Sequence, residues 1–195
     1  MIYLRVESSV STIHFDRMNT IILAAACFTF ALIYASFAEW IIHKYILHRP
    51  LNFFGYKFDY PFKGHAVVHH VMFGADATYD LKNHKPEEQL AHGKKIPMAW
   101  WNGPALIAMA SLPFVIASLI RPFWFMVACI ASAITLYYLA YEYFHYLMHD
   151  PEGRWCASMK FFKAMNNHHL KHHQDARRNL NVVLPIADII LGTRI

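Results

Sequence analysis

The sequence predicts an all-α integral membrane protein, folded as a helical bundle. Its composition is the first reason: 56% of the 195 residues are hydrophobic and only 16% are charged, against about a quarter charged in soluble domains. Three long apolar stretches are the second, because about 20 apolar residues suffice to cross a bilayer. Histidines clustered at the ends of these stretches are the third. We expect one domain over residues 1–195, because this length leaves little room for a second module.

The first predicted span covers about residues 19–42. The sequence then turns polar, and two further helical turns at about 1.5 Å per residue carry His43 and His48 just beyond the hydrocarbon. The segment before the span lacks the charged-then-apolar order of a cleaved signal peptide, so we expect it to be retained. The mixed segment 51–95 is expected to lie at the membrane interface without crossing, with a short helix from His65 to Met72.

Two further spans, at about residues 97–120 and 123–144, are separated only by a short Arg-Pro break. So short a connection predicts an antiparallel helical hairpin. The third span therefore ends on the face that the first one reaches, and it delivers His145 and His149 there.

An amphipathic helix is predicted downstream, from Trp155 to Asp175, and it carries the last histidine cluster. The tail over residues 180–195 is apolar but interrupted by Pro185. It is too short to cross the bilayer, and we expect it to lie against the bundle or the interface.

The positive charges predict the orientation. Arg5 and Arg17 precede the first span and Arg121 lies between the other two, so the remaining fifteen of the 18 Lys and Arg residues lie on the histidine side. The positive-inside rule assigns that side to the cytoplasm. We therefore expect a site on the cytoplasmic face of a bacterial inner membrane or the endoplasmic reticulum. The basic residues form no dense run, so the expected partner is the bilayer and not nucleic acid.

Ten histidines form four clusters, all predicted at one depth. Residues three or four apart on a helix project from one side, so a single helix can present several imidazoles together. Ten nitrogen ligands are too many for one tetrahedral or octahedral ion, and two metal ions are the economical interpretation. The predicted ligands are His43, His48, His65, His69, His70, His145, His149, His169, His172 and His173.

Three carboxylates lie where they could orient these imidazoles, since ligating histidines usually donate their second N–H to such a group. Glu39 and Glu142 each lie about one helical turn before a predicted ligand, and Asp175 follows the last one. We count Glu39 and Glu142 among the catalytic residues. His168 faces about 100° away from the ligand beside it, so we expect a hydrogen-bonding neighbour and not a ligand.

Imidazole ligands suit iron, copper, nickel and zinc alike, but the location favours a redox metal. A site at the end of apolar helices can receive a lipid tail directly from the bilayer, and attack on an unactivated C–H bond is oxidative. Two irons can activate O₂ for such a reaction, whereas zinc has no redox chemistry.

The clusters and their surroundings also resemble a known family. The segments that carry the resemblance are Glu39–His43 with His48-Arg49-Pro50, Tyr143–His149, His168–His173, and the tail through Pro185, Asp188 and Gly192. They are similar to the histidine boxes of the membrane fatty acid hydroxylase and sterol desaturase superfamily. The second box departs from the commoner spacing of that family, because three residues and not two separate His65 from His69.

The resemblance implies a di-iron enzyme that hydroxylates a fatty acyl chain or a related lipid with O₂. It implies that the ten histidines bind two irons, which zinc can replace in purified protein, and that a separate electron-transfer protein supplies electrons. A lipid or sterol desaturase or a carotenoid hydroxylase could use the same site. More distant alternatives are a membrane metal transporter and a zinc hydrolase, for which three ligands and a carboxylate base would suffice.

Overall fold

The computed structural model describes residues 3–75, 98–149 and 155–195, with backbone only at residues 3–17 and 53. It is mostly helical, and three helices are long and apolar enough to cross a membrane: Met18–Leu47, Asn102–Ile120 and Trp124–His149. The predicted helical class and the three spans are confirmed to this extent. Residues 76–97, including the start of the second span as predicted, lie outside the described residues.

The helices differ from their predicted bounds at several ends. Helix α1 (Tyr3–Ile42) begins well before residue 19, and the π-helical turn η1 (His43–Leu47) continues it. Helix α5 (Asn102–Ile120) begins later than predicted, and α6 (Trp124–His149) continues beyond residue 144. The continuation of α6 matters most, because it holds its last histidines on a regular helix.

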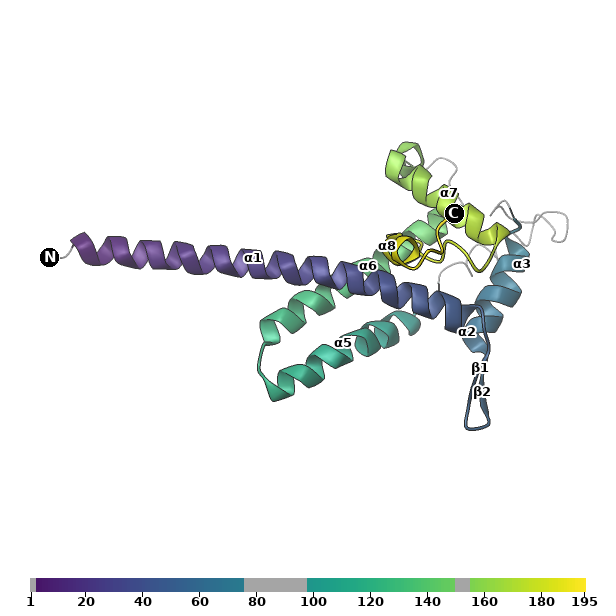
Figure 1. Ribbon diagram of the computed structural model, residues 1–195, viewed down its shortest axis with the longest axis horizontal. Helices are drawn as coiled ribbons and strands as arrows, with labels where there is room; N and C mark the ends of the chain where they lie inside the picture. Colours follow the sequence, from purple (N-terminus) through teal and green to yellow (C-terminus); the bar gives the residue numbers. More distant parts are fainter. Residues whose placement is uncertain (1–2, 76–97, 150–154) are drawn as a thin grey trace.

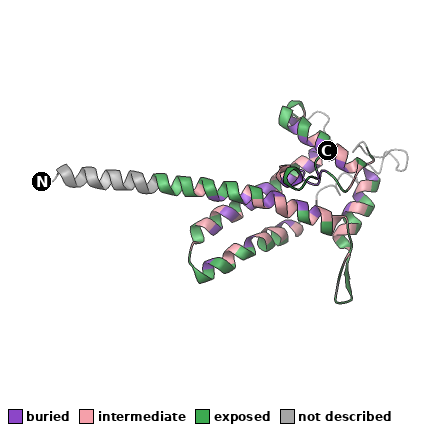
Figure 2. Ribbon diagram, viewed as in Figure 1, coloured by how far each residue is buried: buried purple, intermediate pink, exposed green. Residues whose placement is uncertain are grey.

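Helices α1, α5 and α6 form the bundle that carries the site (Figure 1). At its centre Ala31 and Ala133 are fully buried beside Cys27 and Ile130. Small side chains at such a contact let helix backbones approach closely. The outer surfaces of the bundle are exposed (Figure 2), with apolar side chains such as Leu112 and Leu119 pointing outward, as expected of a surface that faces lipid tails.

The segment after the first span is more structured than the sequence predicted. Strands β1 (Leu51–Phe53) and β2 (Tyr56–Phe58) form an antiparallel hairpin that was not expected. The predicted short helix begins earlier, as α2 (Tyr60–Phe62), and runs through the π-helical η2 (Lys63–His69) into α3 (His70–Met72).

The C-terminal part closes over the histidine end of the bundle. The helix predicted from Trp155 is wrong in its first turn, which is a separate 3₁₀ turn, η3 (Trp155–Ser158), followed by α7 (Lys160–Gln174). The break comes from Met159, whose ψ of 134° is extended. The tail, with its short helix α8 (Ile186–Ile190), lies against α1, as predicted, and the Ser36 hydroxyl donates to the Leu184 carbonyl at 2.8 Å.

Candidate metal centre

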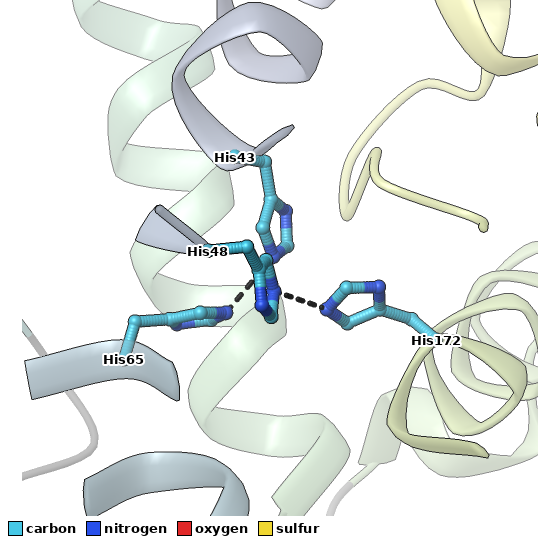
Figure 3. A group of neighbouring side chains, drawn as sticks. All are labelled: His43, His48, His65 and His172. Atoms are coloured by element: carbon cyan, nitrogen blue, oxygen red, sulfur yellow. Dashed lines mark hydrogen bonds between the residues drawn. The ribbon is translucent and has the colours of Figure 1, made fainter. Parts of the chain in front are cut away.

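Two groups of buried histidines could each hold a metal ion. The first group comprises His43, His48, His65 and His172, whose ligand atoms lie within 4.8 Å of one another. Figure 3 shows them converging from η1, the turn after it, η2 and α7. The Nε2 atoms of His43 and His65 are 2.9 Å apart, and those of His48 and His172 are 3.1 Å apart. Ligands about 2.0–2.1 Å from a common ion are spaced at about this distance from each other.

The second group comprises His69, His145, His149 and His169, whose ligand atoms also lie within 4.8 Å of one another. All four are buried, and the Nε2 atoms of His149 and His169 are 3.0 Å apart. Here α6 supplies two imidazoles, η2 one and α7 one.

His70 and His173, the remaining predicted ligands, lie beside the two groups. The Nε2 of His70 is 3.3 Å from that of His65, and the Nε2 of His173 is 3.1 Å from that of His169. The His70 and His173 rings are themselves 4.3 Å apart. All ten predicted ligands therefore come together, as two adjoining sets of five.

Two π-helical turns explain how the first group is assembled. His43 and His48 are five residues apart, as are His65 and His70, a separation that would put them on different sides of an α-helix. A π turn joins residues i and i+5, and the amides of His48 and His70 donate to the carbonyls of His43 and His65. The sequence did not predict either turn.

Backbone carbonyls fix three of the imidazoles. The Nδ1 of His43 faces the Leu180 carbonyl at 2.5 Å, the Nδ1 of His172 faces the Arg178 carbonyl at 2.9 Å, and the Nδ1 of His173 faces the Phe73 carbonyl at 3.1 Å. A carbonyl can only accept, so each Nδ1 carries the proton and each Nε2 presents its lone pair to the site. That is the arrangement of metal-binding histidines.

The remaining nitrogen atoms also fit a metal. Within the described residues, the Nε2 atoms of His69 and His145 are buried without a hydrogen-bond partner, a state that costs about 1–3 kcal/mol per group. Burial lowers the pKa of His48 to about 4 and of His70 to about 3, and lowers those of His65, His69, His169 and His172 as well. Neutral imidazole is the form that binds a metal.

Metal-stripped protein should therefore lose stability as the pH falls below about 6.5, where free histidine titrates. In this range the unfolded chain binds more protons than the fold, in which burial lowers the pKa of these histidines. Each one costs about 1.4 kcal/mol per pH unit until its folded pKa is reached. Thermal melting between about pH 7.5 and pH 5 measures the loss, with the metal-loaded protein expected to resist it. A melting temperature that is flat or rises toward acid would contradict the prediction.

Among the described residues, the hydrogen bonds of Glu39 and Glu142 do not run to imidazoles as the sequence suggested. Glu39 accepts from the Tyr137 hydroxyl at 2.6 Å, the Val182 amide at 2.6 Å and the Asn181 side chain at 3.0 Å. Glu142 accepts from the Met98 amide at 3.0 Å. Their recorded bonds therefore hold the chain around the site and not the rings.

Two further predictions concern residues on or next to α7, Asp175 as a partner of an imidazole and His168 as a hydrogen-bonding neighbour. Asp175 pairs with Arg177 at 3.2 Å on an exposed surface, and its recorded bonds do not reach a histidine. His168 was expected to be a hydrogen-bonding neighbour, and this is confirmed, because its Nε2 lies 2.9 Å from an Asp188 oxygen.

Asp188 is the supporting residue that the sequence reasoning missed. It is fully buried and accepts from the Leu180 amide at 3.0 Å, the Asn181 amide at 2.8 Å and the Thr193 hydroxyl at 2.6 Å, besides His168. Burial alone would raise its pKa, but these hydrogen bonds outweigh burial and lower it. Asp188 thus fixes the segment whose Leu180 carbonyl orients His43. The sequence offered one signal, an aspartate within an apolar tail, because an aspartate that is buried needs partners for its carboxylate.

Two hollows adjoin the histidines. One is almost wholly apolar, lies between α1, α5 and α6, and reaches His43. The other is more polar and is lined by His65, His69 and His145. Leu47, Met98 and Tyr141 line both hollows. The arrangement offers an apolar chain a place beside the histidine groups.

Comparison with known proteins adds no relative. No protein-family model, curated protein or solved structure matches the chain.

Proposed function

We propose that this chain is an O₂-dependent oxidoreductase that hydroxylates an unactivated C–H bond of a lipid at a di-iron centre. One observation carries the proposal: two adjoining groups of imidazoles, buried except for a half-buried His48, lie at one end of three apolar helices, next to an apolar hollow between those helices. The resemblance of the histidine boxes to the fatty acid hydroxylase superfamily points the same way.

The number of imidazoles supports a pair of metals, and their place beside an apolar hollow supports redox-active ones. Two irons held in these groups would supply the redox chemistry for activating O₂. In the overall reaction one oxygen atom enters the C–H bond as a hydroxyl, and the other leaves as water with two protons and two electrons, the electrons coming from a separate electron-transfer protein. The chain's own part is to hold the lone pairs of ten imidazoles at fixed positions. The carbonyls of Leu180, Arg178 and Phe73 do so for three of them, His43, His172 and His173.

The lipid tail would lie in the hollow between the spans. Ala35, Ala38 and Ile134 line it deep in the bundle, and His43 lines it at the metal end. Apolar walls bind an alkyl chain and exclude water from the reacting carbon. The excess of Lys and Arg on the histidine side supports a cytoplasmic site.

The alternatives each explain less of the site. A desaturase or carotenoid hydroxylase could use the same groups and remains a second candidate within the class. A transporter would place its ligands near mid-bilayer, whereas the histidines of the described spans, His43, His145 and His149, lie at the ends of those spans. A zinc hydrolase needs about three protein ligands, which leaves most of the ten unused.

Isotope labelling tests the proposal. Cells that express the chain are grown under oxygen-18-labelled O₂, and their lipids are compared by mass spectrometry with those of cells expressing the His145→Ala variant. We expect a lipid carrying one labelled hydroxyl only with the intact chain, and two irons per purified chain. A product that has lost two hydrogens without label would indicate desaturation. An unchanged lipid profile, or a single bound zinc, would overturn the proposal.

Enlarging a small residue of the apolar hollow should shorten the chains that are accepted. Ala38→Phe adds a ring to the wall, so long acyl chains should react at least about tenfold more slowly while shorter chains are spared, which corresponds to about 1.4 kcal/mol. Chain-length profiling of the hydroxylated lipids measures the shift. The control is Leu112→Phe, on the outer surface of α5. An equal effect on all chain lengths would contradict this placement.

A further inference from the structure

The β1–β2 hairpin is an exposed aromatic element that the proposed chemistry does not use. Its partners are Leu51 with Phe58 and Phe53 with Tyr56, so a two-residue turn of Phe54 and Gly55 joins the strands. Both turn residues have positive φ, 48° and 85°, as the tight hairpin turn requires. Glycine adopts this conformation freely, but a bulky phenylalanine does so rarely.

Several aromatic side chains at and beside the hairpin are exposed. Phe54 is fully exposed and Tyr56 is 71% exposed, with Phe58 and Tyr60 also exposed. A two-stranded hairpin is marginally stable by itself in water, and contiguous exposed apolar surface of this kind indicates a binding surface. A strained, uncovered ring at the tip is difficult to explain if the hairpin is surrounded by water.

The position of the hairpin indicates what covers it. It follows directly on the end of the first span, and the ring of Tyr60 at its base contacts that of Trp101 just before α5 at a tilt of 32°, with ring centroids 5.7 Å apart. Figure 1 shows the hairpin projecting sideways from the axis of α1, toward the side on which α5 lies. An element perpendicular to the spans, at the level of their ends, runs along the membrane surface.

The charges agree with that position. Lys57 and Lys63, at the hairpin and just after it, are 69% and 63% exposed and share Asp59 as an ion-pair partner at 3.3 and 2.9 Å, which leaves one net positive charge there, and Arg49 immediately precedes the hairpin. Tyrosine and tryptophan concentrate at the membrane interface, where lysine side chains reach toward lipid headgroups. Aromatic rings and cations are therefore interleaved as in a segment that lies between headgroups and acyl chains.

We propose that the β1–β2 hairpin is a membrane anchor that inserts Phe54 into the boundary between the headgroups and acyl chains of the leaflet at the histidine end. Burial of the ring in lipid covers the one aromatic side chain that the fold leaves wholly exposed within its described part. Tyr60 and Pro61, which follow the hairpin, line the more polar hollow. The anchor therefore also sets the depth of this side of the hollow in the membrane. The anchor requires neither a bound metal nor a reaction.

Depth measurement tests the anchor. Cys27, Cys129 and Cys156 are free and are replaced by alanine, and a nitroxide is attached at Phe54→Cys in vesicles of phosphatidylcholine with phosphatidylglycerol. Power saturation compares accessibility to O₂, which enters the bilayer, with accessibility to a water-soluble nickel chelate. References are Leu112→Cys on the outer surface of α5 and Arg177→Cys, whose side chain is 88% exposed in the C-terminal part.

We expect the ratio of O₂ to nickel accessibility at position 54 to be several-fold above that at position 177 and to approach that at position 112. A ratio equal to that at position 177 would overturn the anchor. Protection from both reagents would also overturn it, because a protein partner would then cover the tip. To avoid reliance on a cysteine-free chain, the unaltered protein is crosslinked with a phospholipid that carries a diazirine near its glycerol. Labelling of the Phe54 peptide is expected, and its absence counts against the proposal.

Discussion

Alanine in place of His169 should empty one metal position and alanine in place of His172 should empty the other. His169 belongs to the group with His145 and His149, and His172 to the group with His43. Each variant is expected to fall from about two metals per chain to about one. Loss of an outer contact to a ligand already costs about 10- to 100-fold in affinity or activity, so loss of a ligand should remove product formation by more than about 100-fold.

Metal content per chain by mass spectrometry and labelled hydroxyl formation are the two measurements. Arg177→Gln is the control, because Arg177 is exposed just beyond α7. Within the described residues, its hydrogen bonds and ion pair run to Asp175. If the intact chain holds one closed ion, the di-iron proposal fails. If each single variant loses both ions completely, the two groups are not separate positions, and the assignment of residues to two sites is wrong.

The spans and the ten histidines that come together could be predicted, because local sequence determines both. The length of an apolar run decides whether it crosses a bilayer, and His145 and His149, four apart, share one side of α6 wherever the helix is packed. The same argument correctly turned His168 away from the ligands. Because the spans end at the same depth in the membrane, histidine clusters that are far apart in the chain come together.

The division into two groups could not be predicted in this way. It depends on the π turns at His43 and His65. Such turns are determined by packing at the helix ends, and no periodic pattern of residues in the sequence predicts them. The carboxylates were misread for a related reason. Glu39 is close to His43 along the helix, but its oxygens reach Val182, 143 residues away, and a carbonyl of the same distant segment orients the ring.

Asp188→Asn should destabilise the fold and release metal from the first group before the second. The carboxylate accepts four hydrogen bonds while fully buried, and an amide would turn an N–H₂ toward donors. Removal of one partner from such a buried charged cluster costs about 3–5 kcal/mol. The Leu180 and Arg178 carbonyls, which orient His43 and His172 of the first group, belong to the segment that Asp188 holds. Among the described residues, no carbonyl of this segment is seen to bond a histidine of the second group.

Combining this change with the single-site variants separates a local effect from general unfolding. In the His169→Ala background only the first group is expected to be loaded, so adding Asp188→Asn should bring the metal content near zero. In the His172→Ala background it should leave about one metal per chain. Asp175→Asn makes the same chemical change at a partly exposed aspartate and should leave the metal content and the melting temperature nearly unchanged. Equal metal loss in both backgrounds would mean that Asp188 supports the fold as a whole and does not position His43. A residue that positions only the first group of histidines should not affect metal bound to the second.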